Sequence, residues 1–305
     1  MMPLLLIATG LLASPKDCTP CHRAETAAIA GAGMTTALVH PDEIHRRRLT
    51  AALGSYRYEV EGSNYSVTSG EDTLRIPLTW AFGKGSTGQT FLFRREGRWY
   101  ESRMSYYSSL DGLDLTLGFQ NMPQPRDLLE AAGRLLSPKE TKQCFGCHST
   151  APDIPGVQCE RCHGDSAPHL ARKSGMRKLS VLSAGAMADF CGECHRTWDD
   201  VAANGPRGVL NVRFQPYRLA GSKCYDANDR RISCVACHNP HRPVETAAAA
   251  YDAQCQACHK TRATCKVAKK DCVTCHMPRI ELPGAHRAFA DHWIRVVRKD
   301  APYPD

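Results

Sequence analysis

Two cysteines and two histidines stand within eight residues in the stretch Cys234-Val-Ala-Cys237-His238-Asn-Pro240-His241. The two cysteines are one helical turn apart, so both sulfurs can bond to the vinyl groups on one edge of a porphyrin while His238 ligates its iron. Pro240 restricts the backbone between the two histidines, so we expect the ring of His241 to point toward a neighbouring iron. The stretch predicts covalent attachment of one haem and a contact with a second.

The same C-x-x-C-H motif occurs seven times in the chain. The other copies are Cys18/Cys21/His22, Cys144/Cys147/His148, Cys159/Cys162/His163, Cys191/Cys194/His195, Cys255/Cys258/His259 and Cys272/Cys275/His276. Zinc ribbons also use paired C-x-x-C, but zinc gives no reason for a histidine after every second cysteine. A thioredoxin-like site needs a single C-x-x-C near a βαβ unit. The sequence therefore predicts seven covalently attached haem c groups, each with the motif histidine as proximal iron ligand.

Fewer histidines remain than distal positions on seven irons. The six left over are His40, His45, His169, His241, His286 and His292. His286 and His292 are six residues apart, which places them about 120° apart around a helix, so they would serve different irons. His40 and His45 are also explained as helix-end caps. Met34 can complete the set as a thioether ligand that raises the potential of its haem, or it fills space in an alanine-rich helix.

Cys224 and Cys265 belong to no motif. An even number of spare cysteines in an oxidising compartment predicts a disulfide between them, with two free thiols as the alternative.

The composition suits a chain whose core is supplied by cofactors. Aromatic residues make up only 7 % of the 305 residues, which is little for a protein core of this size. We therefore expect folding to depend on the haems. The formal net charge is +8, but each haem with its propionates adds about −1 when ferric and −2 when ferrous. The loaded protein is thus near neutral or acidic, which excludes nucleic-acid binding.

The N-terminal residues 1–13 form an uncharged apolar run that is long enough for a signal peptide and too short to span a bilayer. No other stretch predicts a transmembrane segment. Export is expected, because thioether attachment and disulfides belong outside the reducing cytoplasm.

Hydrophobic periodicity divides the rest of the chain. We expect a first-haem segment at 14–48, a haem-free β-rich insertion at 49–125 and a six-haem region at 126–305. Alternation predicts antiparallel strands, which are expected at 56–60, 65–68, 74–76 and 90–93. Capping signals and composition predict helices at 24–39 (broken at Gly31 and Gly33), 127–136 and 288–297. An irregular linker is expected at 109–125. The expected class is α+β, with short helices and loops packed around haems and an antiparallel insertion between the first and second haem.

The stretch Gly83-Lys-Gly-Ser-Thr-Gly88 matches the dinucleotide-binding pattern G-x-G-x-x-G. It precedes an expected strand instead of opening a helix in a βαβ unit, which favours a hairpin loop over a nucleotide site.

The chain resembles exported multihaem c-type cytochromes, and distantly the tetrahaem cytochromes of hydroxylamine oxidation. The resemblance rests on 144–149, 156–164 with His169, 212–219, 234–241, 272–278 and Asp291-His-Trp-Ile-Arg295. It implies a β-rich insertion after the first haem, and Met or His at the place of Met34. Longer relatives continue into tetratricopeptide repeats, which this sequence does not contain.

These features predict a periplasmic or otherwise exported electron carrier that passes single electrons along closely spaced haems between other redox proteins. Docking to a membrane complex is compatible with that role, and no catalytic residue is needed. The first alternative is a reductase of a small nitrogen or sulfur oxyanion, which needs one iron with an open distal face. The second is a subunit of an extracellular haem filament. No variant motif such as C-x-x-C-K marks a catalytic haem.

Overall fold

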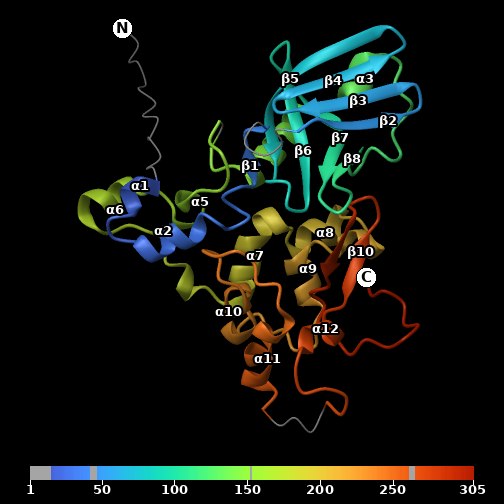
Figure 1. Cartoon of the computed structure of the whole chain (residues 1–305). Coiled ribbons are helices and arrows are strands. Elements are labelled where there is room, and N and C mark those ends of the chain that lie inside the picture. The colour runs from blue at the N-terminus through green and yellow to red at the C-terminus, as the bar shows by residue number, and fades with distance from the viewer. Residues whose placement is uncertain (1–14, 42–46, 152, 261–264) are drawn as a thin grey trace.

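The computed structural model describes residues 15–41, 47–151, 153–260 and 265–305. An antiparallel sheet built from residues 38–135 lies beside a region of short helices and loops, which extends below and to one side of it in Figure 1. The expected mixture of helices with a large antiparallel sheet is confirmed.

The sheet has the strand order β2-β3-β4-β5-β6-β7-β8, with β1 paired to β5 and β9 paired to β7. Buried and exposed side chains alternate along the strands, as at Tyr58 and Val60 and at Tyr65 and Val67. All four predicted strands are confirmed. The strands are β1 (Leu38–Val39), β2 (Leu49–Leu53), β3 (Tyr56–Glu61), β4 (Asn64–Ser69), β5 (Asp72–Phe82), β6 (Gly88–Arg95), β7 (Arg98–Tyr107), β8 (Gly112–Leu115) and β9 (Gly133–Leu135).

The sheet packs around its own aromatic core. Tyr58, Tyr65 and Phe93 are almost fully buried and belong to one cluster with Ala131 and Ala132 of the helix α3 (Leu128–Ala132). The hydroxyl of Tyr65 donates to the carbonyl of Ala132 at 3.0 Å, which ties the helix to the strands. This part of the chain therefore buries its apolar surface without any cofactor.

The glycine-rich stretch 83–88 joins β5 to β6. Gly83 and Gly85 have φ values of +82° and +78°, which glycine adopts without steric cost. The interpretation of this stretch as a hairpin loop is confirmed.

The remaining helices are short and carry few buried side chains. No residue of α2, α4, α6, α10 or α12 is buried. The helices are α1 (Pro15–Cys18), α2 (Arg23–Ile29), α4 (Pro138–His148), α5 (Cys159–His163), α6 (Ala167–Arg172), α7 (Ala184–His195), α8 (Trp198–Asn204), α9 (Gln215–Ala220), α10 (Cys234–Cys237), α11 (Asp252–Cys258) and α12 (Cys272–His276), with 3-10 turns η2 (Leu179–Val181), η3 (Gly208–Asn211), η4 (Arg230–Ile232) and η5 (Ala248–Tyr251).

Several predicted elements are wrong in extent or type. Asp127 caps α3 as predicted, by accepting from the backbone N–H groups of Leu129 and Glu130, but the helix stops at Ala132 and residues 133–135 pair with β7 instead. The expected linker at 109–125 contains β8. The expected helix at 24–39 shortens to α2, and residues 38–39 form β1.

The predicted helix at 288–297 is also wrong. Its first residues lie in β11 (Arg287–Ala290), which forms a hairpin with β10 (Arg279–Leu282). The turn of this hairpin carries Gly284 and His286 at positive φ, and Asp291 donates its backbone N–H to the carbonyl of Pro278. Pairing with β10 satisfies the backbone groups that a helix would have used.

Several contacts join the sheet to the helical region. Phe145 and Cys144 of α4 pack against a cluster of Leu38, Trp80, Leu92 and Leu136. At another edge, Ser109 donates to the backbone carbonyl of His286 at 2.8 Å.

Candidate haem sites

Each C-x-x-C-H motif lies on one helical turn, and we number the sites 1 to 7 in chain order. In sites 1, 5 and 6 the histidine N–H donates to the carbonyl of the first cysteine, from His22 to Cys18 at 2.9 Å, from His238 to Cys234 at 2.9 Å and from His259 to Cys255 at 3.0 Å. A turn of this kind brings the two cysteines onto one side of the backbone. No motif cysteine or motif histidine is fully buried, so the sulfurs and imidazoles remain partly accessible even where the chain encloses them.

Three motif histidines lie opposite a histidine from elsewhere in the chain. The ring centres are 6.2 Å apart for His22 and His169, 5.9 Å for His163 and His241, and 6.1 Å for His238 and His292. Two imidazoles that bind one metal ion through bonds of about 2 Å have their centres about 6 Å apart. The spacing of these donor pairs therefore fits an iron between them.

Hydrogen bonds fix the orientation of three rings. The Nδ1 atom lies 2.9 Å from the carbonyl of Ala37 in His148, 2.9 Å from that of Arg295 in His276, and 3.0 Å from that of Ala290 in His292. A carbonyl only accepts, so Nδ1 carries the proton and the lone pair of Nε2 is left for a metal.

Burial favours the neutral form of several candidate ligands. It lowers the pKa of His148, His163, His195 and His238, and it lowers the pKa of His292 to about 4. The neutral imidazole is the form that binds a metal, so these rings stay ready to ligate at neutral pH.

The other candidate distal ligands lie in different surroundings. His40 stacks on Trp80 with 4.2 Å between ring centres, and the carbonyl of Met34 accepts from the N–H of Val157 at 2.9 Å. The Nε2 atom of His286 lies 2.7 Å from a carboxylate oxygen of Asp114 in the sheet. His45 lies outside the described residues.

The predicted disulfide between Cys224 and Cys265 is not formed. All sixteen cysteines are free, and both of these are exposed. The pKa of the Cys224 thiol is raised by burial and by neighbouring Cys258, which places Cys224 beside site 6. Cys265 begins an exposed stretch that runs to residue 270. Spare cysteines could be counted from the sequence, but their separation depends on the fold.

Contacts between motifs define which sites are neighbours. Cysteine thiols of different motifs lie close enough to shift each other's pKa between sites 1 and 3, 2 and 4, 4 and 5, and 6 and 7; the pairs are Cys18–Cys159, Cys147–Cys194, Cys191–Cys234 and Cys255–Cys272. Arg161 of site 3 pairs with Glu193 of site 4 at 3.1 Å. His238 of site 5 contacts Tyr251, which precedes the helix of site 6.

The two cysteines of a motif are not equally enclosed in sites 1, 5, 6 and 7. The exposed residues are Cys21, Cys237, Cys258 and Cys275, whereas the first cysteines of the same motifs are half-buried. The reason is that each first cysteine contacts a neighbouring motif through its thiol. All four second cysteines remain predicted attachment points.

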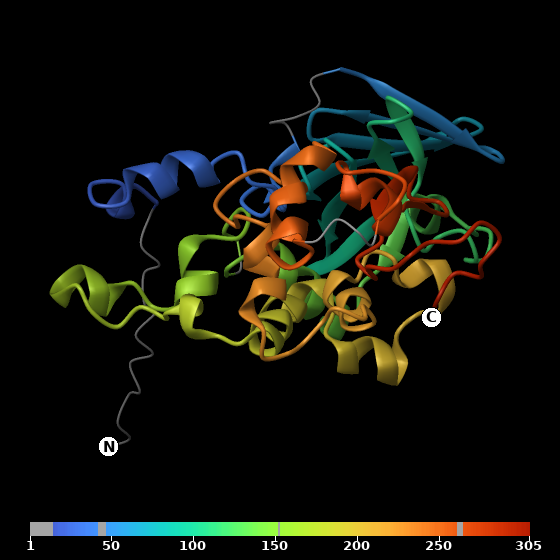
Figure 2. The ribbon, with the colours of Figure 1, turned by 90° about the horizontal axis from the view of Figure 1, so that it is seen from below.

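The thiol pairs, the Arg161–Glu193 ion pair and the His238–Tyr251 contact together form a line from site 1 through sites 3, 4, 5 and 6 to site 7, with site 2 beside site 4. Figures 1 and 2 agree with it, because the segments of sites 1 and 3 lie together at one end of the helical region. In Figure 1, α7 and α10 lie between that end and α11 and α12.

Repeated C-x-x-C-H turns with paired histidines define a multihaem c-type cytochrome. Residues 153–251 match the model of the family described as cytochrome c3, and this stretch contains sites 3, 4 and 5. No curated protein matches the chain. The chain is also similar to a solved structure, the crystal structure of the outer cell wall cytochrome OcwA, with 13 % identity and a TM-score of 0.39. The likeness covers 60 % of this chain and 37 % of that one.

Proposed function

We propose that this multihaem cytochrome binds seven haem c groups and carries single electrons along them between redox partners outside the cytoplasm. The observation that carries the proposal is the three histidine pairs with ring centres 5.9–6.2 Å apart. Each pair joins a motif histidine to one from another segment, which would close both axial positions of an iron. An iron with two imidazole ligands has no open position for a substrate, so it suits electron transfer.

The roles of the residues follow from their positions. The motif cysteines would hold the porphyrin edge, and the motif histidines would bind the iron from one side. His169, His241 and His292 would bind the other side in sites 1, 3 and 5. His40, His45 and Met34 are the proposed distal ligands of other sites. Bound haem would supply a reversible one-electron iron couple at each site.

The neighbour relations support a continuous route. Each site on the line contacts the next through motif side chains, except that Tyr251, just before the helix of site 6, makes the contact with site 5. Site 2 touches both site 4 and the sheet, so it would form a side branch. Sites 1 and 7 would be the two ends of the route and would exchange electrons with partners.

Export is part of the proposal, because haem attachment through thioethers suits an oxidising compartment. No helix in the described part of the chain is long and apolar enough to cross a membrane.

Intact-protein mass spectrometry tests the stoichiometry. The mature holoprotein should carry seven haem masses, because all seven motifs are intact. Five or fewer on fully matured protein would contradict the proposal.

One observation favours a second candidate, a reductase of a small nitrogen or sulfur oxyanion. The Nε2 atom of His286 is bonded to Asp114, so five histidines and Met34 remain for seven distal positions. An iron without a distal ligand could bind an anion such as nitrite. Low-temperature electron paramagnetic resonance (EPR) separates the two functions, because a carrier shows only low-spin ferric signals. A high-spin signal of one haem equivalent that shifts with nitrite would favour the reductase.

A further inference from the structure

The buried ion pair of Arg218 and Asp291 is linked by hydrogen bonds to the segments that carry His292 and His276. Nothing in the electron-transfer role requires it. We propose that Arg218 and Asp291 form a positioning unit that orients His292 in site 5 and His276 in site 7 together. The inference rests on the proposed function, since it concerns histidines that would bind haem iron.

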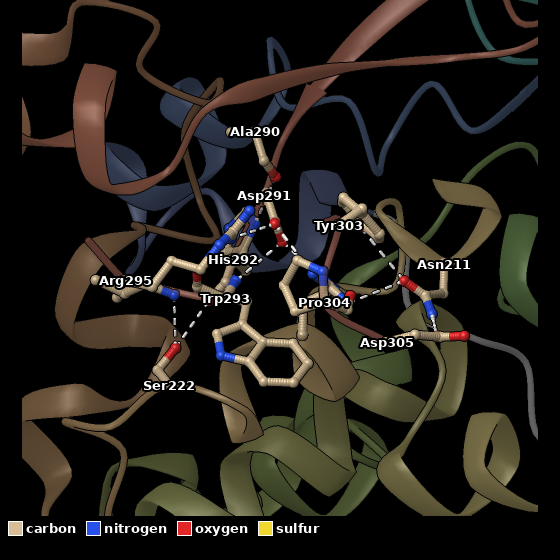
Figure 3. A network of polar contacts seen from close by, with 12 residues as sticks. Asn211, Ser222, Ala290, Asp291, His292, Trp293, Arg295, Tyr303, Pro304 and Asp305 are labelled. Atoms are coloured by element: carbon tan, nitrogen blue, oxygen red, sulfur yellow. Dashed lines mark hydrogen bonds and ion pairs between the residues drawn. The ribbon is translucent and has the colours of Figure 1, made fainter. Parts of the chain in front are cut away.

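Arg218 of α9 and Asp291 after β11 are both fully buried. Two parallel hydrogen bonds join them, from Nε to Oδ1 at 2.9 Å and from Nη2 to Oδ2 at 3.0 Å. Nη1 also donates to the side-chain oxygen of Asn211 at 3.2 Å and to the carbonyl of Pro304 at 2.7 Å (Figure 3). A guanidinium with this many partners has one orientation.

Two aromatic rings cover the guanidinium. Its central carbon lies 4.8 Å from the ring centre of Trp293 and 4.4 Å from that of Tyr303. Gly221 permits the first contact, because a Cβ atom there would lie 2.5 Å from the Trp293 ring. The C-terminal segment is thereby held against α9.

Bonds on both sides fix the backbone of His292. The carboxylate of Asp291 accepts from the N–H of Trp293 at 3.0 Å. Ser222 donates to the carbonyl of His292 at 3.1 Å and accepts from the N–H of Ile294 at 2.7 Å. With Nδ1 bonded to Ala290, the ring has little freedom, and it faces His238.

The same carboxylate reaches His276 through Arg295. The side chain of Arg295 donates to Asp291 and to the carbonyl of Trp293. Its backbone N–H donates to the carbonyl of His276 at 3.2 Å, and its carbonyl accepts from Nδ1 of His276 at 2.9 Å. A shift of Asp291 would therefore also shift the carbonyl of Arg295, which orients the ring of His276.

A buried ion pair adds little net stability compared with apolar side chains of the same shape, but it allows one geometry only. Orientation of an axial imidazole is one way in which a protein tunes its haem. A positioning role explains why two charges are buried here.

The test uses two single variants of the full-length holoprotein. Asp291→Asn keeps the shape of the side chain and removes its charge, and Arg218→Lys keeps the charge and removes the planar guanidinium. We expect the low-spin EPR signals and midpoint potentials of two haems to shift, with the number of attached haems unchanged. His292→Ala should instead convert one haem to high spin and leave the signal of site 7 in place. Shifts at only one haem, or at none, would overturn the shared role.

A second variant decides the question if these proteins do not fold. Gly221→Ala adds no charge and displaces the Trp293 ring on which Arg218 stacks, so it should shift the same two signals. Unchanged signals would overturn the inference. Arg48→Lys is the matched control, because Arg48 pairs with Glu59 of β3 in the sheet; it should leave all haem signals in place. Wild-type protein without attached haem would refute the proposed function itself, whereas wild-type spectra in loaded variants would refute only the positioning unit.

Discussion

Whether a histidine can bind a metal depends on which of its nitrogens is already bonded. His148, His276 and His292 donate Nδ1–H to carbonyls and keep Nε2 for a metal. His286 has its Nε2 on Asp114 and the edge of its ring against Tyr107. Its bonding therefore suits a contact between the sheet and the β10–β11 hairpin.

Replacing His241 and His286 should separate a ligand from an interface residue. His241→Ala removes the ring opposite His163, so we expect one haem equivalent to become high-spin and to bind carbon monoxide when reduced. His286→Ala serves as the matched control and should leave the EPR spectrum unchanged. EPR of the oxidised proteins and Soret spectra of the reduced proteins measure both effects. Low-spin signals that persist in full in His241→Ala would rule out its role in site 3.

The proximal ligands could be predicted from the sequence, because C-x-x-C-H is a local pattern in which one helical turn places every group. The distal ligands could only be listed as candidates. His169 follows site 3 but faces His22 of site 1, and His241 follows site 5 but faces His163 of site 3. These pairings depend on how the segments cross in space, and no local periodicity records that. The ion pair between Arg218 and Asp291 could not be predicted for the same reason, because the two residues are 73 positions apart. One hint of it stands in the sequence: Asp291 directly precedes the candidate ligand His292.

The exposure of the motif cysteines could not be predicted either. All seven motifs have the same local pattern, yet Cys21 and Cys275 are exposed while Cys147 and Cys162 are half-buried. The difference comes from the neighbours that the fold brings to each turn. Cys147 contacts Cys194 of another motif, and a contact of this kind between distant segments leaves no trace in the local sequence.

At the scale of elements, the helix that carries site 2 owes its start to a capping box. Ser137 accepts from the N–H of Glu140, and Glu140 accepts from the N–H of Ser137. Hydrogen bonds from Ser137 and Arg134 lower the pKa of Glu140 from 4.5 to about 2. The ionised carboxylate is thus part of the cap above pH 4.5.

Glu140→Ala should destabilise the protein in a pH-dependent way. The pKa is lowered on folding, so the stabilisation is complete above the unfolded value and is lost as the pH falls toward the folded one. We expect a loss of about 1 kcal/mol at neutral pH, typical of a helix cap, and a loss that vanishes near pH 2. Unfolding midpoints at several pH values measure this. Lys142→Ala, on an exposed position of the same helix, is the control; an equal, pH-independent loss in both would contradict the capping role.

A single glycine links the loop between sites 2 and 3 to the segment after site 1. Gly156 has φ +62°, and a Cβ atom there would lie 1.9 Å from the carbonyl oxygen of Thr35. Gly156→Ala should therefore cost more than the 1–2 kcal/mol typical of a left-handed backbone, roughly twice as much. Gly54→Ala is the matched control, because Gly54 has φ +60° and open space around it. Denaturant unfolding compares the two, and equal losses would show that the contact with Thr35 is unimportant.

The predicted helix at 288–297 shows where element prediction failed. Its alanine and aromatic residues suit a helix or a strand equally, and the partner strand β10 decided the outcome. The sheet strands were predictable because alternation with period two has one explanation only.

At the scale of the whole molecule, apolar burial is unevenly shared. The cluster of Tyr58, Tyr65, Phe91, Phe93 and their neighbours lies within the sheet and α3, whereas five of the motif-region helices bury no side chain at all. Among the described residues, every buried aromatic side chain except Tyr217 lies in the sheet region. Haems would supply the core of the helical half, as the composition predicts.

This asymmetry predicts how the full chain behaves when haem is not attached. Hydrogen exchange followed by mass spectrometry on chain produced without haem attachment should show slow exchange in β3 to β7. Exchange should be fast in α10 and α12, because neither helix has a buried residue to hold it closed. The loaded protein is the control, and there protection should spread to the motif helices. Equal protection of both halves without haem would contradict haem as the core of the helical half. Loss of protection throughout would show that even the sheet, with its own aromatic cluster, depends on cofactor packed against α4.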